Sequence, residues 1–319
     1  MPNQTATRPV YLPMIPAQQP SPLQRIDVPL TRSLPVQLYL KRDDLLHPLV
    51  SGNKWRKLKY NLLAAKQAGL ETMLTFGGAR SNHLYATAAA GQLFGFRTIG
   101  VVRGDEPALL QSPTLQFCAS AGMHLHPVNR AAFREIESPE FLDELQKLYG
   151  PAYVLPEGGT NEEAIRGAAE IMPELMEQLG TAPDAVCCAV GTGGTVAGLA
   201  RSAPQSTRVL GFMALKGWHP PLDPAYPNLH YLTDYHFGGY AKTRPELLQF
   251  MADFEAQTGV LIEQVYTAKM LYGLIDLARR GFFEPGARVV AIHTGGLQGR
   301  LPQDRLSQGR LPAVTPPNV

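Results

Sequence analysis

Lys54 is the residue whose position in the chain best suits covalent chemistry. It ends the stretch Ser51-Gly52-Asn53-Lys54 and stands in the first turn of a predicted helix, at the edge of that helix's apolar stripe. Partial burial and the helix dipole both disfavour the charged amine and so lower its pKa. A neutral amine is the form that attacks a carbonyl group. The helix alone equally fits a solvated lysine whose aliphatic stem covers apolar surface.

A second candidate site is the glycine loop Gly191-Thr192-Gly193-Gly194-Thr195, between the apolar run 185–190 and a predicted helix. Backbone N–H groups and the positive end of a helix bind anions in such loops, and threonine hydroxyls add donors. No Lys-Ser/Thr pair follows it, as a P-loop requires. Residues 207–215 lack the acid of a dinucleotide fingerprint. A ligand-free turn is the alternative; together with a reactive amine, the loop indicates a cofactor with a phosphate and an aldehyde.

Further candidates lie where other predicted strands end. Ser81-Asn82-His83 follows a glycine-bearing turn and could bind a carboxylate, although a helix N-cap is the simpler role of Ser81. Tyr240 and Tyr266 lie beside small residues, where packing is the commoner role of tyrosine. Thr294 follows the last strand and could contact the ring of a ligand. No cluster has the spacing of metal ligands, so we expect no metal.

The elements that must position these residues alternate between strand and helix. Apolar patterns predict strands at 36–41, 72–76, 98–102, 124–128, 153–155, 185–190, 209–214 and 288–292. Helices are predicted at 54–68, 81–95, 107–121, 139–148, 160–179 with a kink at Pro173, up to 201 after the glycine loop, 245–258 and 267–280. Residues 1–34 read as an extended arm, 216–244 as irregular and the chain from 302 as loosely held. The alternation predicts an α/β fold with mainly parallel sheets covered on both faces, whose ligands bind at the carboxyl ends of strands.

Composition excludes several classes of function. The chain has 319 residues, 45% hydrophobic and 18% charged, and a net charge of +2. We therefore expect a globular protein without nucleic-acid or membrane partners. Its three cysteines form no disulfide framework, and no signal peptide is evident, so a cytoplasmic location is the expectation.

The ordered motifs resemble one family. Their set is Leu40-Lys41-Arg42-Asp43-Asp44, Ser51-Gly52-Asn53-Lys54, Ser81-Asn82-His83, Pro156-Glu157-Gly158-Gly159-Thr160, Gly191-Thr192-Gly193-Gly194-Thr195, Val265-Tyr266-Thr267 and His293-Thr294-Gly295-Gly296. From about residue 38 to 297 the chain resembles a fold-type II pyridoxal-phosphate (PLP) enzyme of the D-cysteine desulfhydrase and 1-aminocyclopropane-1-carboxylate (ACC) deaminase group.

The resemblance implies a tryptophan-synthase-β-like fold of two open, three-layer α/β/α domains. The large PLP-binding domain would comprise residues 1–56 and 164–319, the small one 57–163, and the enzyme would be a homodimer. Lys54 would hold PLP covalently, and Asn82, Thr294 and the loop residues Thr192, Gly193, Gly194 and Thr195 would complete the cofactor site. The substrate, a small amino acid, would contact Ser81, Asn82, His83, Tyr240 and Tyr266, of which Ser81 and the tyrosines, with Lys54, would act in catalysis.

Two departures concern specificity. Thr267 stands where the deaminase pattern has a glutamate near the pyridine nitrogen, and Thr294 stands where that pattern has an apolar residue. Both favour the desulfhydrase branch, and so an α,β-elimination that converts D-cysteine to pyruvate, ammonia and hydrogen sulfide. The alternatives are deamination of ACC, D-serine or another amino acid, a PLP-binding relative without activity, and, from another class, a non-catalytic anion- or nucleotide-binding protein.

Overall fold

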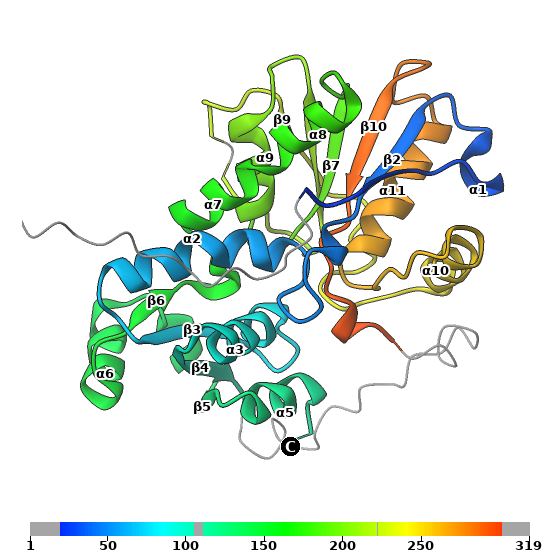
Figure 1. Ribbon diagram of the computed structural model, residues 1–319. Helices are drawn as coiled ribbons and strands as arrows, with labels where there is room; N and C mark the ends of the chain where they lie inside the picture. Colours follow the sequence, from blue (N-terminus) through cyan, green and yellow to red (C-terminus); the bar gives the residue numbers. More distant parts are fainter. Residues whose placement is uncertain (1–19, 105–110, 222, 302–319) are drawn as a thin grey trace, which may run out of the picture. The chain divides into compact units, whose positions relative to one another are not determined.

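The computed structural model describes residues 20–104, 111–221 and 223–301, which belong to two compact units (Figure 1). Among these residues, one unit comprises Trp55–Gly167 and the other comprises 20–54 and 168–301. The chain passes between the units within helix α2 (Asn53–Gln67) and within helix α7 (Glu162–Ala169). Lys54 is the last residue of the second unit before the first passage.

The unit that contains Lys54 is built on a six-stranded sheet in the order β1-β2-β10-β7-β8-β9. All neighbouring strands are parallel except β1 and β2, which are antiparallel. The strands are β1 (Leu23–Arg25), β2 (Gln37–Lys41), β7 (Ala185–Val190), β8 (Arg208–Met213), β9 (Leu229–Leu232) and β10 (Arg288–Ile292). The helices are α1 (Pro29–Arg32), α8 (Ile171–Leu179), α9 (Gly194–Ser202), α10 (Pro245–Thr258) and α11 (Thr267–Arg279), with short 3-10 turns at Asp43–Leu45 and Leu297–Gly299.

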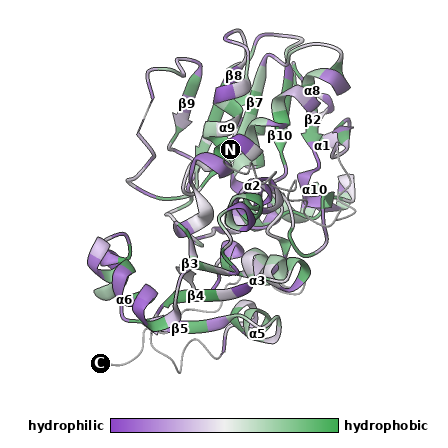
Figure 2. Ribbon diagram, turned by 60° about the vertical axis from the view of Figure 1, so that its left-hand side comes forward, coloured by the Kyte–Doolittle hydropathy of each residue, from purple (hydrophilic) through white to green (hydrophobic). Residues whose placement is uncertain are grey.

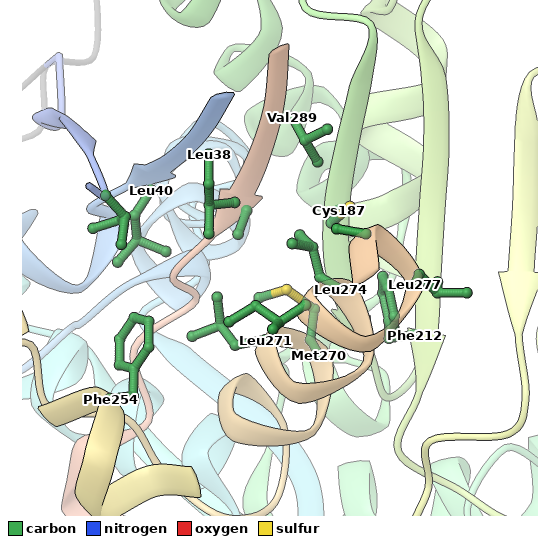
Figure 3. Packing of buried hydrophobic residues seen from close by; sticks show 14 of the residues in the cluster. Leu38, Leu40, Cys187, Phe212, Phe254, Met270, Leu271, Leu274, Leu277 and Val289 are labelled. Atoms are coloured by element: carbon green, nitrogen blue, oxygen red, sulfur yellow. The ribbon is translucent and has the colours of Figure 1, made fainter. Parts of the chain in front are cut away.

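Strand β7 shows why this sheet needs helices on both faces. Cys187 packs in a cluster with α10 and α11, whereas its neighbours Val186 and Cys188 pack in a cluster with α8 and α9. Every residue of β7 is buried, so the strand reads as a continuous apolar run, as predicted for a parallel sheet. Figure 3 shows the first cluster, in which Leu271 and Leu274 of α11 face the sheet. Each fully buried leucine there stabilises the fold by about 1.5–3 kcal/mol.

The other unit contains a four-stranded parallel sheet in the order β5-β4-β3-β6. Its strands are β3 (Thr72–Gly78), β4 (Arg97–Arg103), β5 (His124–Val128) and β6 (Tyr153–Leu155). Besides α2 and α7 it has α3 (Asn82–Phe94), α5 (Pro113–Ser120) and α6 (Pro139–Tyr149), with 3-10 turns at Ala132–Glu135 and Glu157–Gly159. One face packs on α6 and the other on α3 and α5. Figure 2 shows hydrophobic residues concentrated in the strands of both sheets. The predicted α/β fold of three-layer, mainly parallel units is thus confirmed.

The structure differs from the expected elements in four places. The arm expected at 1–34 includes strand β1 and helix α1, and the irregular stretch 216–244 includes β9. Both strands are short edge strands, joined to the sheet by backbone bonds rather than by an apolar pattern of their own. Helix α5 begins at Pro113 with Ser112 as its N-cap, not at Pro107, which lies outside the described residues. The helix expected at 160–179 breaks at Glu170, one turn before Pro173, which has no N–H group to donate.

Candidate active site

The motifs around Lys54 meet because three of them follow adjacent strands. Strands β2, β10 and β7 are neighbours and run parallel. The chain that leaves β2 reaches Lys54, β7 leads into the glycine loop 191–195, and β10 leads into Thr294. The carboxyl ends of parallel strands lie at one edge of a sheet, which is where α/β proteins bind ligands. The topology therefore gathers three separate parts of the sequence into one candidate site.

Gly52 fixes the approach of the chain to Lys54. Its φ of +64° lies in the left-handed region, which glycine adopts without strain. A Cβ atom at this position would overlap the carbonyl group of Thr294, and the next residue, Asn53, donates its N–H to the same carbonyl oxygen at 3.2 Å. Only a glycine lets the two loops lie this close. The start of α2, and with it Lys54, is thereby held against the loop that follows β10.

Asn53 also connects Lys54 to the glycine loop. Its side-chain Nδ2 donates a hydrogen bond of 2.8 Å to Oγ1 of the buried Thr195. Thr195 belongs to the first turn of α9, and Gly193 before that helix has a φ of +91°. Glycine is needed there as well, because a Cβ on Gly193 would lie 2.6 Å from Cγ of Pro220. The amine-bearing helix and the loop that precedes α9 thus form one connected structure.

The environment of Lys54 favours its neutral amine. The side chain is partly buried, and desolvation lowers its pKa from 10.5 to about 8, an effect that the interaction with Cys188 opposes. Cys188 lies on β7, so the amine is close to the strand that leads into the glycine loop. At pH 7 roughly a tenth of such amines are neutral, against about one in 3,000 for an ordinary lysine. Lys54 is therefore suited to react with an aldehyde near neutral pH.

His293 holds the loop after β10 in place. The side chain is fully buried, and its Nε2 lies 2.7 Å from the carbonyl oxygen of Leu261. Its Nδ1 accepts a hydrogen bond from the N–H of Gly295 at 3.2 Å. Burial lowers the pKa of His293, with Asp44 acting in the opposite direction. A neutral imidazole that donates through Nε2 and accepts at Nδ1 satisfies both contacts and fixes the residues on either side of Thr294.

Tyr240 and Tyr266 form an aromatic pair beside the glycine loop. Their ring centroids are 6.2 Å apart in an edge-to-face arrangement. A Cβ on Gly191 would lie 3.3 Å from the ring and hydroxyl oxygen of Tyr266, so this ring packs against the start of the loop. Tyr240 is 42% exposed, unusually accessible for so large a side chain. The structure thus brings both tyrosines to the part of the unit that contains Lys54 and the loop.

Thr267, which stands in place of the glutamate of the deaminase pattern, is the first residue of α11. It is fully buried at the start of α11, where its Oγ1 accepts a 2.9 Å hydrogen bond from the N–H of Glu263 and lies 3.2 Å from the Glu263 carbonyl oxygen. The Glu263 carboxylate in turn accepts from the N–H groups of Tyr266 and Thr267 at 2.8 and 2.7 Å. The Thr267 hydroxyl therefore bonds with Glu263 at the N-terminus of α11.

Ser81, Asn82 and His83 belong to the other unit, so their meeting with Lys54 stays a prediction. Ser81 is the N-cap of α3 and accepts a hydrogen bond of 3.2 Å from the N–H of Leu84. His83 is only 2% exposed, and its Nε2 lies 2.9 Å from Oγ1 of Thr75 on β3. Because His83 is so deeply buried, its contacts within this unit are those of a packing residue. Ser81 and Asn82 stand at the carboxyl end of β3, where a ligand would bind.

Two residues of the site were missed from the sequence. Asn53 is part of the Lys54 stretch, but its bond to Thr195 joins residues 142 positions apart. Lys269 is buried in α11 and binds the backbone next to Tyr240. A lysine between Ala268 and Met270 on a largely apolar helix was the only sequence signal for it.

The residues present fit a cofactor that has an aldehyde and a phosphate. Lys54 supplies an amine whose pKa is lowered to about 8, and the loop before α9 supplies backbone donors and hydroxyls without any acidic side chain. Among the described residues, no group of three His, Cys, Asp or Glu could hold a metal ion. None of the helices formed by these described residues is both long and apolar enough to cross a membrane. All three cysteines are buried and free in the structure.

Comparisons with known proteins show the family of this chain. A family model described as "Pyridoxal-phosphate dependent enzyme" matches residues 15–295. The mitochondrial bifunctional D-cysteine desulfhydrase/1-aminocyclopropane-1-carboxylate deaminase of Arabidopsis thaliana is 30% identical over 317 residues, 89% of this chain and 78% of the relative. The D-cysteine desulfhydrase of Salmonella typhi is 30% identical over 319 residues, 87% of this chain and 92% of the relative.

A crystal structure described as that of an ACC deaminase homologue is similar over most of both chains. It has a TM-score of 0.76 and 28% identity, and the match covers 91% of this chain and 94% of the other. The parallel α/β units, the covalent chemistry open to Lys54 and the family match therefore lead to one conclusion. The chain belongs to the family of pyridoxal-phosphate dependent enzymes and has their fold-type II architecture.

Proposed function

We propose that this protein is a lyase that removes the β-thiol of D-cysteine, with pyruvate, ammonia and hydrogen sulfide as products. The observation that carries the proposal is Lys54, an amine with a pKa of about 8 that Gly52 and Asn53 hold beside the glycine loop. Bound PLP supplies an electron sink for the α-carbon of an amino acid. Binding of the substrate and proton transfer are the tasks of the residues of the chain.

Each residue has a role in this proposal. The N–H groups of the loop before α9, with Thr192 and Thr195, would hold the cofactor phosphate, and Lys54 would hold its aldehyde. Ser81 and neighbouring N–H groups bind the substrate carboxylate, and Asn82 contacts the cofactor. The Lys54 amine, free while the substrate is bound, would accept the proton of the substrate α-carbon. Overall, D-cysteine and one water would give pyruvate, ammonia and hydrogen sulfide. Tyr240 and Tyr266 flank the substrate and exclude water from its reacting side.

Two observations favour elimination from D-cysteine over opening of the ACC ring. Thr267 replaces the glutamate of the deaminase pattern, and its hydroxyl serves the start of α11, so no acid from this position reaches the ring nitrogen. Thr294 replaces an apolar residue of that pattern. Deamination of ACC or of D-serine is the second candidate function, because the Arabidopsis relative is named for both a desulfhydrase and a deaminase.

Parallel assays on one preparation test this proposal. D-cysteine, L-cysteine, D-serine, β-chloro-D-alanine and ACC are compared for release of oxo acid, ammonia and, from the cysteines, sulfide. We expect D-cysteine to be the best substrate and Lys54→Ala to lose both turnover and the chromophore that borohydride fixes to the protein. Preference for ACC or D-serine would establish the second candidate. Full turnover by Lys54→Ala would refute the proposed chemistry.

We also propose the arrangement that the resemblance implies. The large domain, residues 1–56 and 164–319, binds PLP, the small domain comprises 57–163, and two copies form a homodimer in the cytoplasm. The location of Lys54 and the glycine loop in one compact unit supports the assignment of PLP to the large domain. The free cysteines suit a reducing compartment. Light scattering of the purified protein measures the oligomeric state directly.

A further inference from the structure

Lys269 is a buried lysine whose amine binds backbone rather than a carboxylate. It is 1% exposed, and its Nζ donates hydrogen bonds of 2.8 Å to the carbonyl oxygens of His236 and Gly239. Burial lowers its pKa from 10.5 to about 8, while Glu263 acts to raise it. A buried amine is costly unless its donors are satisfied. Both carbonyls lie in one short segment, so the hydrogen bonds that satisfy the buried amine also hold that segment in place.

The segment that Lys269 binds is a strained turn. Phe237 and Ala241 have φ values of +54°, which residues other than glycine rarely adopt. Gly238 and Gly239 between them have φ values of +99° and +114°. Local bonds within the turn join Gly239 N–H to the His236 carbonyl and Lys242 N–H to the Gly239 carbonyl, at 3.0 and 3.1 Å. Strained backbone persists only where the surroundings hold it, and such strain is concentrated at functional sites. Lys269 supplies that hold from the rigid helix α11.

Tyr240 is the residue that this turn presents. It follows directly on Gly239, stands edge-to-face with Tyr266 and is 42% exposed. Two residues at the start of α11 therefore restrict the position of Tyr240. Tyr266, the N-cap of the helix, packs against its ring, and Lys269 binds the carbonyl groups of the turn. We propose that Lys269 is a positioning residue, which fixes the direction of Tyr240 toward the substrate through the carbonyls of His236 and Gly239. This inference rests on the proposed function in one respect, that Tyr240 contacts the substrate.

The matched control is a second buried lysine of the same unit. Lys41 is fully buried and, like Lys269, donates to a backbone carbonyl, that of Ser21 at 2.7 Å. It also forms an ion pair of 2.9 Å with Glu174. None of these partners belongs to the turn that carries Tyr240. Lys41→Met therefore removes a buried ammonium without touching the turn, and Lys269→Met removes one that holds it.

The first measurement needs no substrate. Amide hydrogen exchange, followed by mass spectrometry on the PLP-bound protein, compares peptides that cover residues 236–242. Exchange in this turn is expected to be at least about tenfold faster in Lys269→Met than in wild type, and unchanged in Lys41→Met. Equal exchange in Lys269→Met and wild type would overturn the proposal whatever the enzyme does. This result does not depend on the proposed reaction.

The second measurement is a double-mutant cycle on kcat/KM for D-cysteine. Lys269→Met is expected to lower kcat/KM by about tenfold or more in wild type but by less than about threefold in a Tyr240→Ala background. Lys41→Met is expected to have the same effect in both backgrounds. Equal effects of Lys269→Met in the two backgrounds would overturn the positioning role. Absence of turnover in the wild-type enzyme would instead refute the proposed function, and the exchange experiment would still decide whether Lys269 holds the turn.

Discussion

Replacing Gly52 by alanine should damage the site around Lys54 by forcing the loop after β10 away from the start of α2. An alanine at a φ of +64° costs roughly 1–2 kcal/mol relative to glycine. In addition, the new Cβ would lie within 3.0 Å of three backbone atoms, the carbonyl oxygen and carbon of Thr294 and the nitrogen of Gly295. Backbone atoms cannot turn away as a flexible side chain can, so the two loops must separate. Overpacking of this kind costs about 1–3 kcal/mol.

Gly69 provides the matched control for this substitution. It has a nearly identical φ of +69°, at the other end of the same helix, but no atom lies within 4 Å of the position of its Cβ. Gly69→Ala therefore carries only the backbone cost of roughly 1–2 kcal/mol, and Gly52→Ala carries about 2–5 kcal/mol in total. The difference between the two variants isolates the contact between Gly52 and Thr294.

Urea denaturation of both apoproteins and titration with PLP measure the two consequences. Gly52→Ala should lose more free energy of unfolding than Gly69→Ala and bind PLP at least about tenfold more weakly, which corresponds to 1.4 kcal/mol. Gly69→Ala should bind PLP as wild type does, because it leaves the start of α2 unchanged. If Gly52→Ala were as stable as Gly69→Ala and bound PLP normally, the loop after β10 would not be what holds Lys54 in place.

Two further predictions concern the same unit. Since only the neutral Lys54 amine reacts, coupling of PLP to the apoprotein should accelerate with pH through an apparent pKa of about 8; stopped-flow absorbance measures this, and a midpoint near the ordinary 10.5 would contradict the desolvation of Lys54. Asn53→Ala should weaken PLP binding by about 3–10-fold, the value of one hydrogen bond, and Thr195→Val should weaken it by at least as much, because its hydroxyl is also proposed to bind the phosphate; the double variant should lose no more than Thr195→Val alone. Additive losses in the PLP titration would show that the bond does not connect the two segments.

Much of the fold follows from local patterns in the sequence. Ala185–Val190 is apolar at every position because both faces of β7 are covered, and the predicted strand bounds are those observed. The rule that ligands bind at carboxyl ends of strands singles out the glycine loop and Thr294 as candidates, and the structure places both after strands adjacent to β2, which leads to Lys54. By contrast, β9 has only one fully buried residue, Leu229, so its sequence lacks an alternating pattern. Edge strands of this kind are held by hydrogen bonds to the backbone of the neighbouring strand, and a local sequence pattern does not reveal these bonds.

The parts of the site that could not be predicted depend on pairs far apart in the chain. Asn53 and Thr195 are each ordinary polar residues until the fold brings them to 2.8 Å. The contacts of Thr267 could not be predicted for the same reason, because its hydroxyl bonds with Glu263, an acid one helical turn earlier that has no sequence pattern of its own. Such contacts decide where a side chain points. Residue type and spacing decide only that it stands near the site.

The short strand β1 has a consequence for how the protein behaves at high concentration. It pairs antiparallel with β2, the strand that leads to Lys54, and so occupies what would otherwise be an open edge of the six-stranded sheet. Open edges recruit strands from other molecules, which is a common route to aggregation. Buried Ser21, just before β1, secures the cover by donating a hydrogen bond of 2.6 Å to Asp43. The residues around β1 thus protect the catalytic unit from self-association through its β2 edge, although they contribute no group to the chemistry.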